Sequence, residues 1–150
     1  MKGDVSDTPA QLKARALRHL VRREHSRAEL ERKLAPHAES PEALRALLDL
    51  LLSKRQQSDE RYAEERARSL SRKYGAAKIR QDLKARGVAE DIVDRVSAEG
   101  EFERAKTILA RKYREPATTR KERAKRMRFL LGRGFSYEVI RGVLSSGDDE

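Results

Sequence analysis

The side chains in this sequence with the clearest chemical role are the positively charged ones in a run of bases over residues 120–128. The run holds six lysines and arginines and one acid, Glu122. Bases at this density bind polyanions, because each phosphate that they neutralise releases condensed counterions. On a helix they would cover most of the surface outside the core stripe, so some must point away from any charge partner in the fold. The run therefore predicts electrostatic binding of an anionic partner.

Further groups of bases lie earlier in the chain, around the short helices expected near Leu30 and Ile79. A solvated helix face is the simpler interpretation for any single base, but their repetition favours a strip that binds a partner. The candidate residues for this strip are Arg22, Arg23, Lys78, Arg80, Lys84, Arg86, Arg120, Lys121, Arg123, Lys125, Arg126, Arg128 and Arg133.

Catalytic and metal-binding patterns are missing from the sequence. The absence of cysteine excludes disulfides, thiolate chemistry and cysteine-based zinc sites. His19, His25 and His37 have no carboxylate at a metal-ligand spacing, and we expect them at the surface or at helix ends. Gly132 and Gly134 lack the strand and the Lys-Ser/Thr pair of a phosphate loop. We therefore expect no catalytic residue, no metal and no cofactor.

Composition points to a basic protein built from thin helices. Lysine and arginine total 35 against 25 acids, a formal charge of +10, which favours polyanionic partners, although compositional bias would also produce it. Charged residues make up 40% of the chain and hydrophobic residues 37%, which suits helices that each bury one stripe. No apolar run approaches the ~20 residues of a membrane span, and no signal peptide is visible. We expect a soluble, cytoplasmic monomer that does not bind membranes.

Helix signals recur along the whole chain, and convincing strand patterns do not. Small polar residues before apolar periods predict helix starts, and Gly75 is expected to end the fourth helix as its C′ residue. The predicted starts of six of the nine short helices lie at Thr8-Pro9, Ser26, Ser40-Pro41, Ser58, Thr119 and Ser136.

An internal repeat organises these helices. Residues 83–96 align with residues 130–143 through a shared Leu, Arg-Gly turn, acid and β-branched pair. The sequence thus predicts an all-α fold of three tandem three-helix repeats that stack into an elongated, curved body. The expected divisions are a flexible N-terminus (1–9), the repeats (10–56, 57–99 and 100–145) and an acidic tail (146–150).

The Arg-Gly turns are similar to those of helix-turn-helix units. Gly87 and Gly134 stand where a helix must reverse, which favours a residue that tolerates positive φ, and Val88 and Phe135 can pack back on the helix end. A tight helical hairpin is the simpler interpretation, and we prefer it to sequence-specific reading of a DNA duplex. Aromatic residues are too few to supply many stacking platforms for bases.

Four segments, in order along the chain, resemble the RecX family, the bacterial regulators of the RecA recombinase. They are Arg23-Glu24-His25-Ser26 with Glu29-Leu30, Arg61-Tyr62-Ala63 after Asp59, Gly75 with Ile79, Leu83 and Gly87, and Arg133-Gly134-Phe135-Ser136 with Ile140. Gly132 and Gln57-Ser58 depart from the family pattern at two turns. The ordered set is specific, although no single segment is.

The resemblance implies a non-enzymatic modulator, chiefly an inhibitor, of RecA in DNA repair, recombination and the SOS response. Such proteins are thought to bind the groove of the RecA–DNA filament and to hinder filament growth, strand exchange and ATP hydrolysis. The expected partners are the RecA filament and DNA, single- or double-stranded, within it. A stand-alone basic DNA-binding module is the alternative, and a catalytic function is the least supported.

Overall fold

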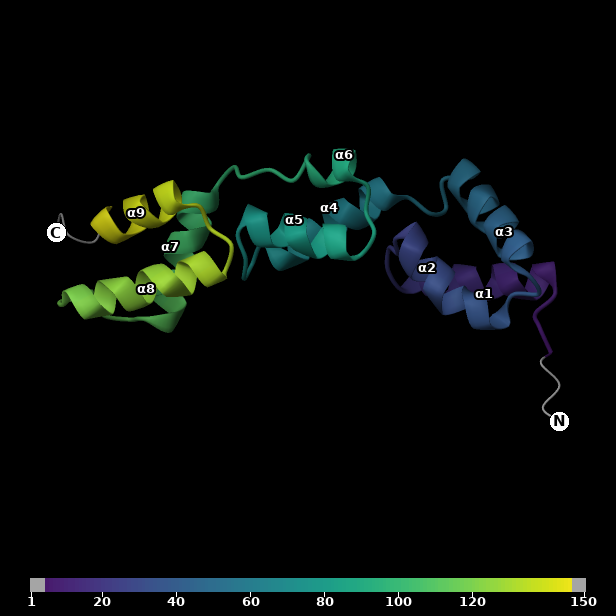
Figure 1. Ribbon diagram of the computed structural model, residues 1–150, viewed down its shortest axis with the longest axis horizontal. Coiled ribbons are helices and arrows are strands. Elements are labelled where there is room, and N and C mark those ends of the chain that lie inside the picture. The colour runs from purple at the N-terminus through teal and green to yellow at the C-terminus, as the bar shows by residue number, and fades with distance from the viewer. Residues whose placement is uncertain (1–4, 147–150) are drawn as a thin grey trace. The chain divides into compact units, whose positions relative to one another are not determined.

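The structure is a computed structural model that describes residues 5–146 of the chain. All regular elements in this range are helical, which confirms the predicted all-α fold (Figure 1). The expected acidic tail beyond Ser146 and residues 1–4 of the expected flexible N-terminus lie outside the described residues. The helices are α1 (Pro9–Arg22), α2 (Arg27–Leu34), the 3-10 helix η1 (Ala35–His37), α3 (Pro41–Ser53), α4 (Asp59–Leu70), α5 (Ala76–Ala85), α6 (Glu90–Val93), α7 (Glu101–Lys112), α8 (Arg120–Gly132) and α9 (Tyr137–Ser146).

Hydroxyl side chains begin the helices at the predicted positions. In α1 the Gln11 N–H donates to Thr8 Oγ1 (3.2 Å), and the Thr8 N–H donates to Gln11 Oε1 (2.9 Å), so the two residues cap each other. Each such cap satisfies N–H groups that have no partner inside the helix. Single hydroxyl caps begin α2, α3 and α8 at Ser26, Ser40 and Thr119.

The chain divides into two compact units. The first consists of residues 1–65 with 84–92, and the second of residues 66–83 with 93–150. Residues of the expected second repeat, 57–99, therefore contribute to both units. The three repeat boundaries and the elongated body stay predictions.

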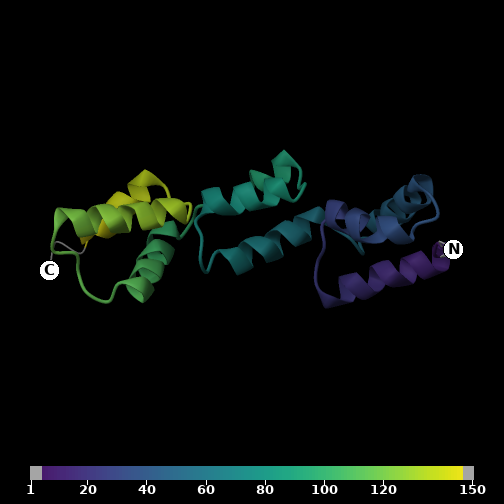
Figure 2. The same ribbon diagram turned by 60° about the horizontal axis from the view of Figure 1, so that its bottom comes forward.

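The first unit is a small bundle of α1, α2 and α3, which Figure 2 shows from a second side. Each helix turns one apolar stripe inward, as the spacing of its leucines predicts. Burying a leucine side chain contributes roughly 2 kcal/mol, so this cluster makes a large contribution to the stability of the unit. Its buried members are Leu12, Ala16, Leu30, Leu34, Leu44, Leu47, Leu48 and Leu51.

A buried glutamine joins the start of α2 to the start of α4 within the first unit. Gln57 is 1% exposed, and its Nε2 donates to the His25 carbonyl (3.3 Å) and to Asp59 Oδ1 (2.9 Å). The same Asp59 oxygen accepts from the Arg27 N–H (2.8 Å). Gln57 departs from the family pattern, and here its side-chain amide is both buried and hydrogen-bonded.

The second unit contains α7, α8 and α9 around a core that includes Ile108, Leu130 and Ile140. Gly75 has a different role from the one predicted. Helix α4 ends at Leu70, and Gly75 directly precedes α5, where its N–H donates to the Arg133 carbonyl (2.8 Å). A Cβ at Gly75 would lie 2.5 Å from the Gly134 carbonyl oxygen, so close backbone contact, and not a helix C′ position, requires this glycine.

The two Arg-Gly turns adopt the predicted conformation. Gly87 has a φ of 83° and Gly134 a φ of 90°, in the left-handed region that other residues avoid. The next residues, Val88 and Phe135, are only 4% and 3% exposed. Each turn thus reverses the chain and returns an apolar side chain to the core.

Candidate partner-binding surface

Metal-ligand clusters and serine side chains are the first features of the described residues to consider as a site. Within residues 5–146 no three histidine or acidic residues come together as a metal site. None of the helices in this range has the length and apolar composition that a membrane span requires. Ser26 and Ser40 both accept hydrogen bonds as helix caps, which explains their positions without catalysis.

His25 lies at a helix end, next to Ser26, the N-cap of α2, but it is buried, with only 2% of its surface exposed. Its Nδ1 is 3.0 Å from the Arg23 carbonyl oxygen and its Nε2 is 3.0 Å from Lys33 Nζ. Burial lowers the pKa of His25 below its ordinary value. The ring therefore serves as a neutral hydrogen-bonding member of the core.

Arg23, one candidate of the partner-binding strip, is paired with the buried carboxylate of Glu29. Arg23 makes two bonds to Glu29, with Nη1 3.0 Å from Oε1 and Nη2 2.5 Å from Oε2. Burial raises the pKa of Glu29, but the hydrogen bonds and charge of Arg23 outweigh it and lower the pKa to about 2. The guanidinium of Arg23 thus stabilises the first unit, whatever else it contacts.

This ion pair predicts acid sensitivity. Because the folded pKa of Glu29 lies below its ordinary value of 4.5, its contribution is complete above that value and is lost as the pH falls towards 2. Arg23 is half exposed, so solvent screening limits the effect to about 2 kcal/mol. Urea unfolding of the wild type and of Glu29→Gln at pH 7 and pH 3 measures it. We expect the wild type to lose more stability than the variant, and equal losses would contradict this role of the pair.

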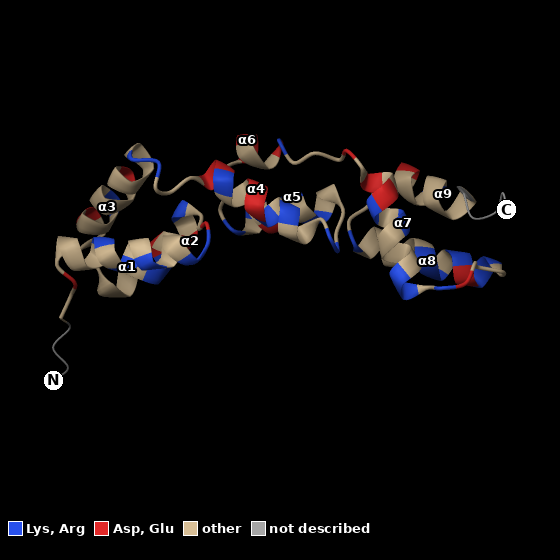
Figure 3. Cartoon of the chain, turned by 180° about the vertical axis from the view of Figure 1, so that it is seen from behind, with Lys and Arg blue, Asp and Glu red and all other residues tan. Residues whose placement is uncertain are grey.

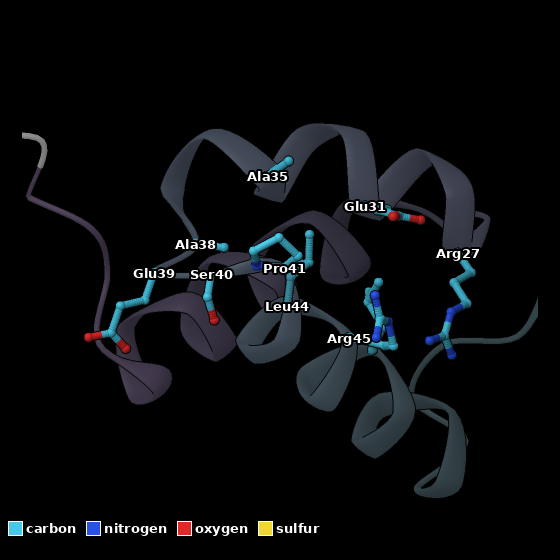
Figure 4. A pocket seen from close by; sticks show the side chains of 10 residues that line it. Arg27, Glu31, Ala35, Ala38, Glu39, Ser40, Pro41, Leu44 and Arg45 are labelled. Carbon is cyan, nitrogen blue, oxygen red and sulfur yellow. The ribbon is translucent and has the colours of Figure 1, made fainter.

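A pocket of the first unit has a volume of about 440 Å³ and lies between α2, η1 and α3 (Figure 4). Its charged side chains are balanced, with Arg27 and Arg45 against Glu31 and Glu39. Arg27 is also ion-paired to Asp49 (2.7 Å). The lack of net charge in its lining makes the pocket a poor site for a polyanion.

Two candidates in the second unit make contacts that the fold itself uses. Arg80 Nη2 donates to the Val96 carbonyl (2.6 Å). Arg133 Nη1 donates to the Lys73 carbonyl (3.2 Å), and its guanidinium lies 5.3 Å from the centre of the Tyr74 ring. Both side chains are half-buried, so replacing either would disturb packing as well as charge.

The candidates on α8 form the most open group, and Figure 3 shows Lys and Arg along this helix. Lys121, Lys125 and Arg128 are exposed, and their spacing of four and three residues places them on one face. We call these three residues the α8 stripe. The single acid of the run, Glu122, accepts from the Thr118 N–H (2.7 Å), which lowers its pKa and fixes it at the start of the helix. Within residues 5–146 no ion pair neutralises the α8 stripe.

The remaining candidates are dispersed. Arg22, Lys84 and Arg86 belong to the first unit, with the first two exposed and Arg86 half-buried. In the second unit Lys78 is exposed on α5, Arg120 and Arg123 are exposed on α8, and Arg126 lies 4.5 Å from the centre of the Tyr113 ring.

A second group of bases lines a pocket of about 390 Å³ in the second unit, and of its members only Arg133 is among the candidate residues predicted from the sequence. The bases are Arg72 and Lys73 after α4 and Arg111 and Lys112 at the end of α7, together with Arg133. The sequence carried one signal for them, because an Arg-Lys-Tyr triplet occurs at residues 72–74 and again at residues 111–113. We call this group the basic pocket.

Comparison with known proteins relates the chain to one family. Residues 58–96 match the model of the second three-helix domain of RecX, and residues 99–144 match that of the third. Regulatory protein RecX of Ralstonia nicotianae is 43% identical, covering 93% of this chain and 90% of the relative. RecX of Neisseria meningitidis is 42% identical, covering 93% and 92%. The crystal structure of RecX from Lactobacillus salivarius superimposes with a TM-score of 0.82 over 95% of this chain and 97% of that one, at 22% identity.

Proposed function

The chain belongs to the RecX family of regulatory proteins, and from this premise we propose that it inhibits RecA by binding the groove of the RecA–DNA filament. The observation that carries the proposal is family membership over nearly the whole chain, together with an exposed, unneutralised α8 stripe. The filament is an assembly of protein and phosphate with a large negative field. Long-range attraction and charge-assisted hydrogen bonds would hold a basic body against it.

Obstruction of the groove explains inhibition without any catalytic residue. A body that spans neighbouring RecA subunits would hinder filament growth and strand exchange, and would slow the ATP hydrolysis that accompanies them. We propose that the protein acts in this way as a non-enzymatic, cytoplasmic monomer that takes part in DNA repair and recombination.

The first test measures ATP hydrolysis by RecA on single-stranded DNA while the purified protein is titrated in. The fraction of RecA that is bound follows mass action. We therefore expect the rate of ATP hydrolysis to fall as the concentration of the added protein rises and to reach a plateau several-fold below the uninhibited rate. Heat-denatured protein serves as the control. An unchanged rate at saturating protein would contradict the proposal.

The competing function is a stand-alone DNA-binding module, favoured by the net charge of +10 and the Arg-Gly turns. Such a module would bind naked duplex as tightly as it binds filaments, with a steep loss of affinity as salt rises. Titrations of naked DNA and of RecA-coated DNA at two salt concentrations separate the two functions. Tighter binding to the filament supports regulation of RecA.

A further inference from the structure

The basic pocket differs in composition from the charge-balanced pocket of the first unit. Its lining contains five bases and no acid, and its apolar part is formed by Tyr74, Ile108 and Phe129. No ion pair within residues 5–146 neutralises these five bases. Bringing like charges together costs free energy, and an anion bound between them would recover that cost. The pocket is therefore suited to an anionic ligand.

Aromatic rings hold two of the cations in place. Lys112 Nζ lies 4.4 Å from the centre of the Phe129 ring, and the Arg133 guanidinium lies 5.1 Å from the same centre. Arg133 also donates to the Lys73 carbonyl. Cation–π contacts and this hydrogen bond restrict long side chains before any ligand arrives, which reduces the entropic cost of binding.

The size and the apolar part of the pocket narrow the class of ligand. A volume of about 390 Å³ falls within the roughly 300–1,000 Å³ that small-ligand sites occupy. An isolated phosphate or carboxylate would use the bases but leave the apolar surface of Ile108 and Phe129 uncovered. A nucleotide carries both an anion and a planar, largely apolar ring, and guanidinium groups and aromatic rings are the usual supports for such a ring.

We propose that the basic pocket binds one nucleotide of a single-stranded DNA, with the phosphate held by Arg72, Arg111 and Lys112 and the base against the apolar part. This deepens the proposed function and rests on it for the choice of a strand over a free nucleotide. An acidic protein surface would match the charges alone. The pocket thereby gives the protein a contact with DNA that is separate from the α8 stripe.

The test compares two double variants of the full chain in the absence of RecA. Arg72→Ala with Arg111→Ala removes two exposed bases of the pocket, and Arg45→Ala with Lys54→Ala removes two exposed bases of the first unit. Binding of a fluorescein-labelled oligothymidine is followed by anisotropy. We expect about tenfold weaker binding for the pocket variant and less than a twofold change for the control. The slope of the logarithm of the binding constant against the logarithm of the salt concentration should become shallower by about 0.7 for each phosphate that the pocket variant no longer neutralises. Thermal unfolding of both variants verifies that each is folded.

Three further ligands distinguish the possible occupants. An abasic oligomer of equal length should bind at least about fivefold more weakly, because it has no base to stack. Tight binding of free dTTP that the pocket variant abolishes would support the nucleotide site but assign it to a free nucleotide. Equal losses for both double variants, or equal affinity for the abasic oligomer, would overturn the proposal. The third ligand is RecA without DNA. If the pocket variant lost binding to this RecA alone and kept its binding to the oligonucleotide, the proposal would also be overturned.

RecA is absent from the oligonucleotide titrations, so these titrations and the assay of ATP hydrolysis by RecA test the two proposals independently. A protein that inhibits RecA but whose pocket variant binds DNA normally would refute the nucleotide site alone. A protein that binds the oligonucleotide through the pocket but leaves ATP hydrolysis unchanged would refute only the proposed regulation of RecA.

Discussion

Replacing Lys121, Lys125 and Arg128 with alanine together is expected to weaken binding to RecA filaments about tenfold, since a basic face raises association rates by that factor or more. The three side chains share one exposed face of α8, and alanine is the strongest helix former, so helicity should not fall. Fluorescence anisotropy of filaments assembled on labelled single-stranded DNA measures the affinity. Circular dichroism measures the helix content.

A matched variant separates this face from net charge. Arg18→Ala, Arg45→Ala and Lys54→Ala remove the same charge from positions of the first unit. We expect this control to bind filaments within about twofold of the wild type. If both triple variants lost affinity equally, the α8 stripe would contribute no more than general attraction.

Gly134→Ala is expected to cost about 3 kcal/mol of unfolding free energy. The residue has a φ of 90°, where an L side chain is strained by about 1 kcal/mol or more. Its new Cβ would lie 2.4 Å from Lys78 Cβ and 2.6 Å from the Lys78 backbone nitrogen. Backbone atoms cannot rotate away as a flexible side chain can, so the turn and α5 must move apart, at a further cost of about 2 kcal/mol.

Gly132→Ala provides the control on the same helix. Its Cβ would meet no atom within 4 Å, and Gly132 is the last residue of α8. Alanine there should leave stability unchanged or raise it by up to about 1 kcal/mol. Urea unfolding followed by circular dichroism compares the two variants. If the two variants had equal urea midpoints, the close approach of Gly134 and Lys78 would not be what excludes a side chain at position 134.

Features fixed by neighbouring residues could be predicted from the sequence. The caps at Thr8, Ser26 and Thr119 depend on a hydroxyl and the N–H three residues later, so the local pattern was enough. Gly87 and Gly134 follow in the same way from the demand for positive φ at a helix reversal. The α8 stripe was also accessible, because residues on one helix fall at known angles.

Features created by tertiary contact were missed or wrongly assigned. Gly75 is required by the backbone of Gly134, which lies in a different helix connection, so its own neighbours suggested only a helix end. His25 stands at a helix end as expected, but its burial was missed, because it depends on the packing that brings the His19 ring to 5.5 Å from its own. The basic pocket combines bases from residues 72–73 and 111–112, which are far apart in the chain and meet only through the tertiary fold of the second unit.

Site-specific crosslinking tests the binding face most directly. A photoreactive residue replaces Lys125 on the α8 stripe in one protein and Lys54, the C-cap of α3, in another. Each is irradiated with RecA filaments on single-stranded DNA, and the products are mapped by mass spectrometry. We expect crosslinks to RecA or DNA from position 125 and few from position 54. Crosslinks from position 54 with none from position 125 would contradict the proposed docking of α8 in the filament groove.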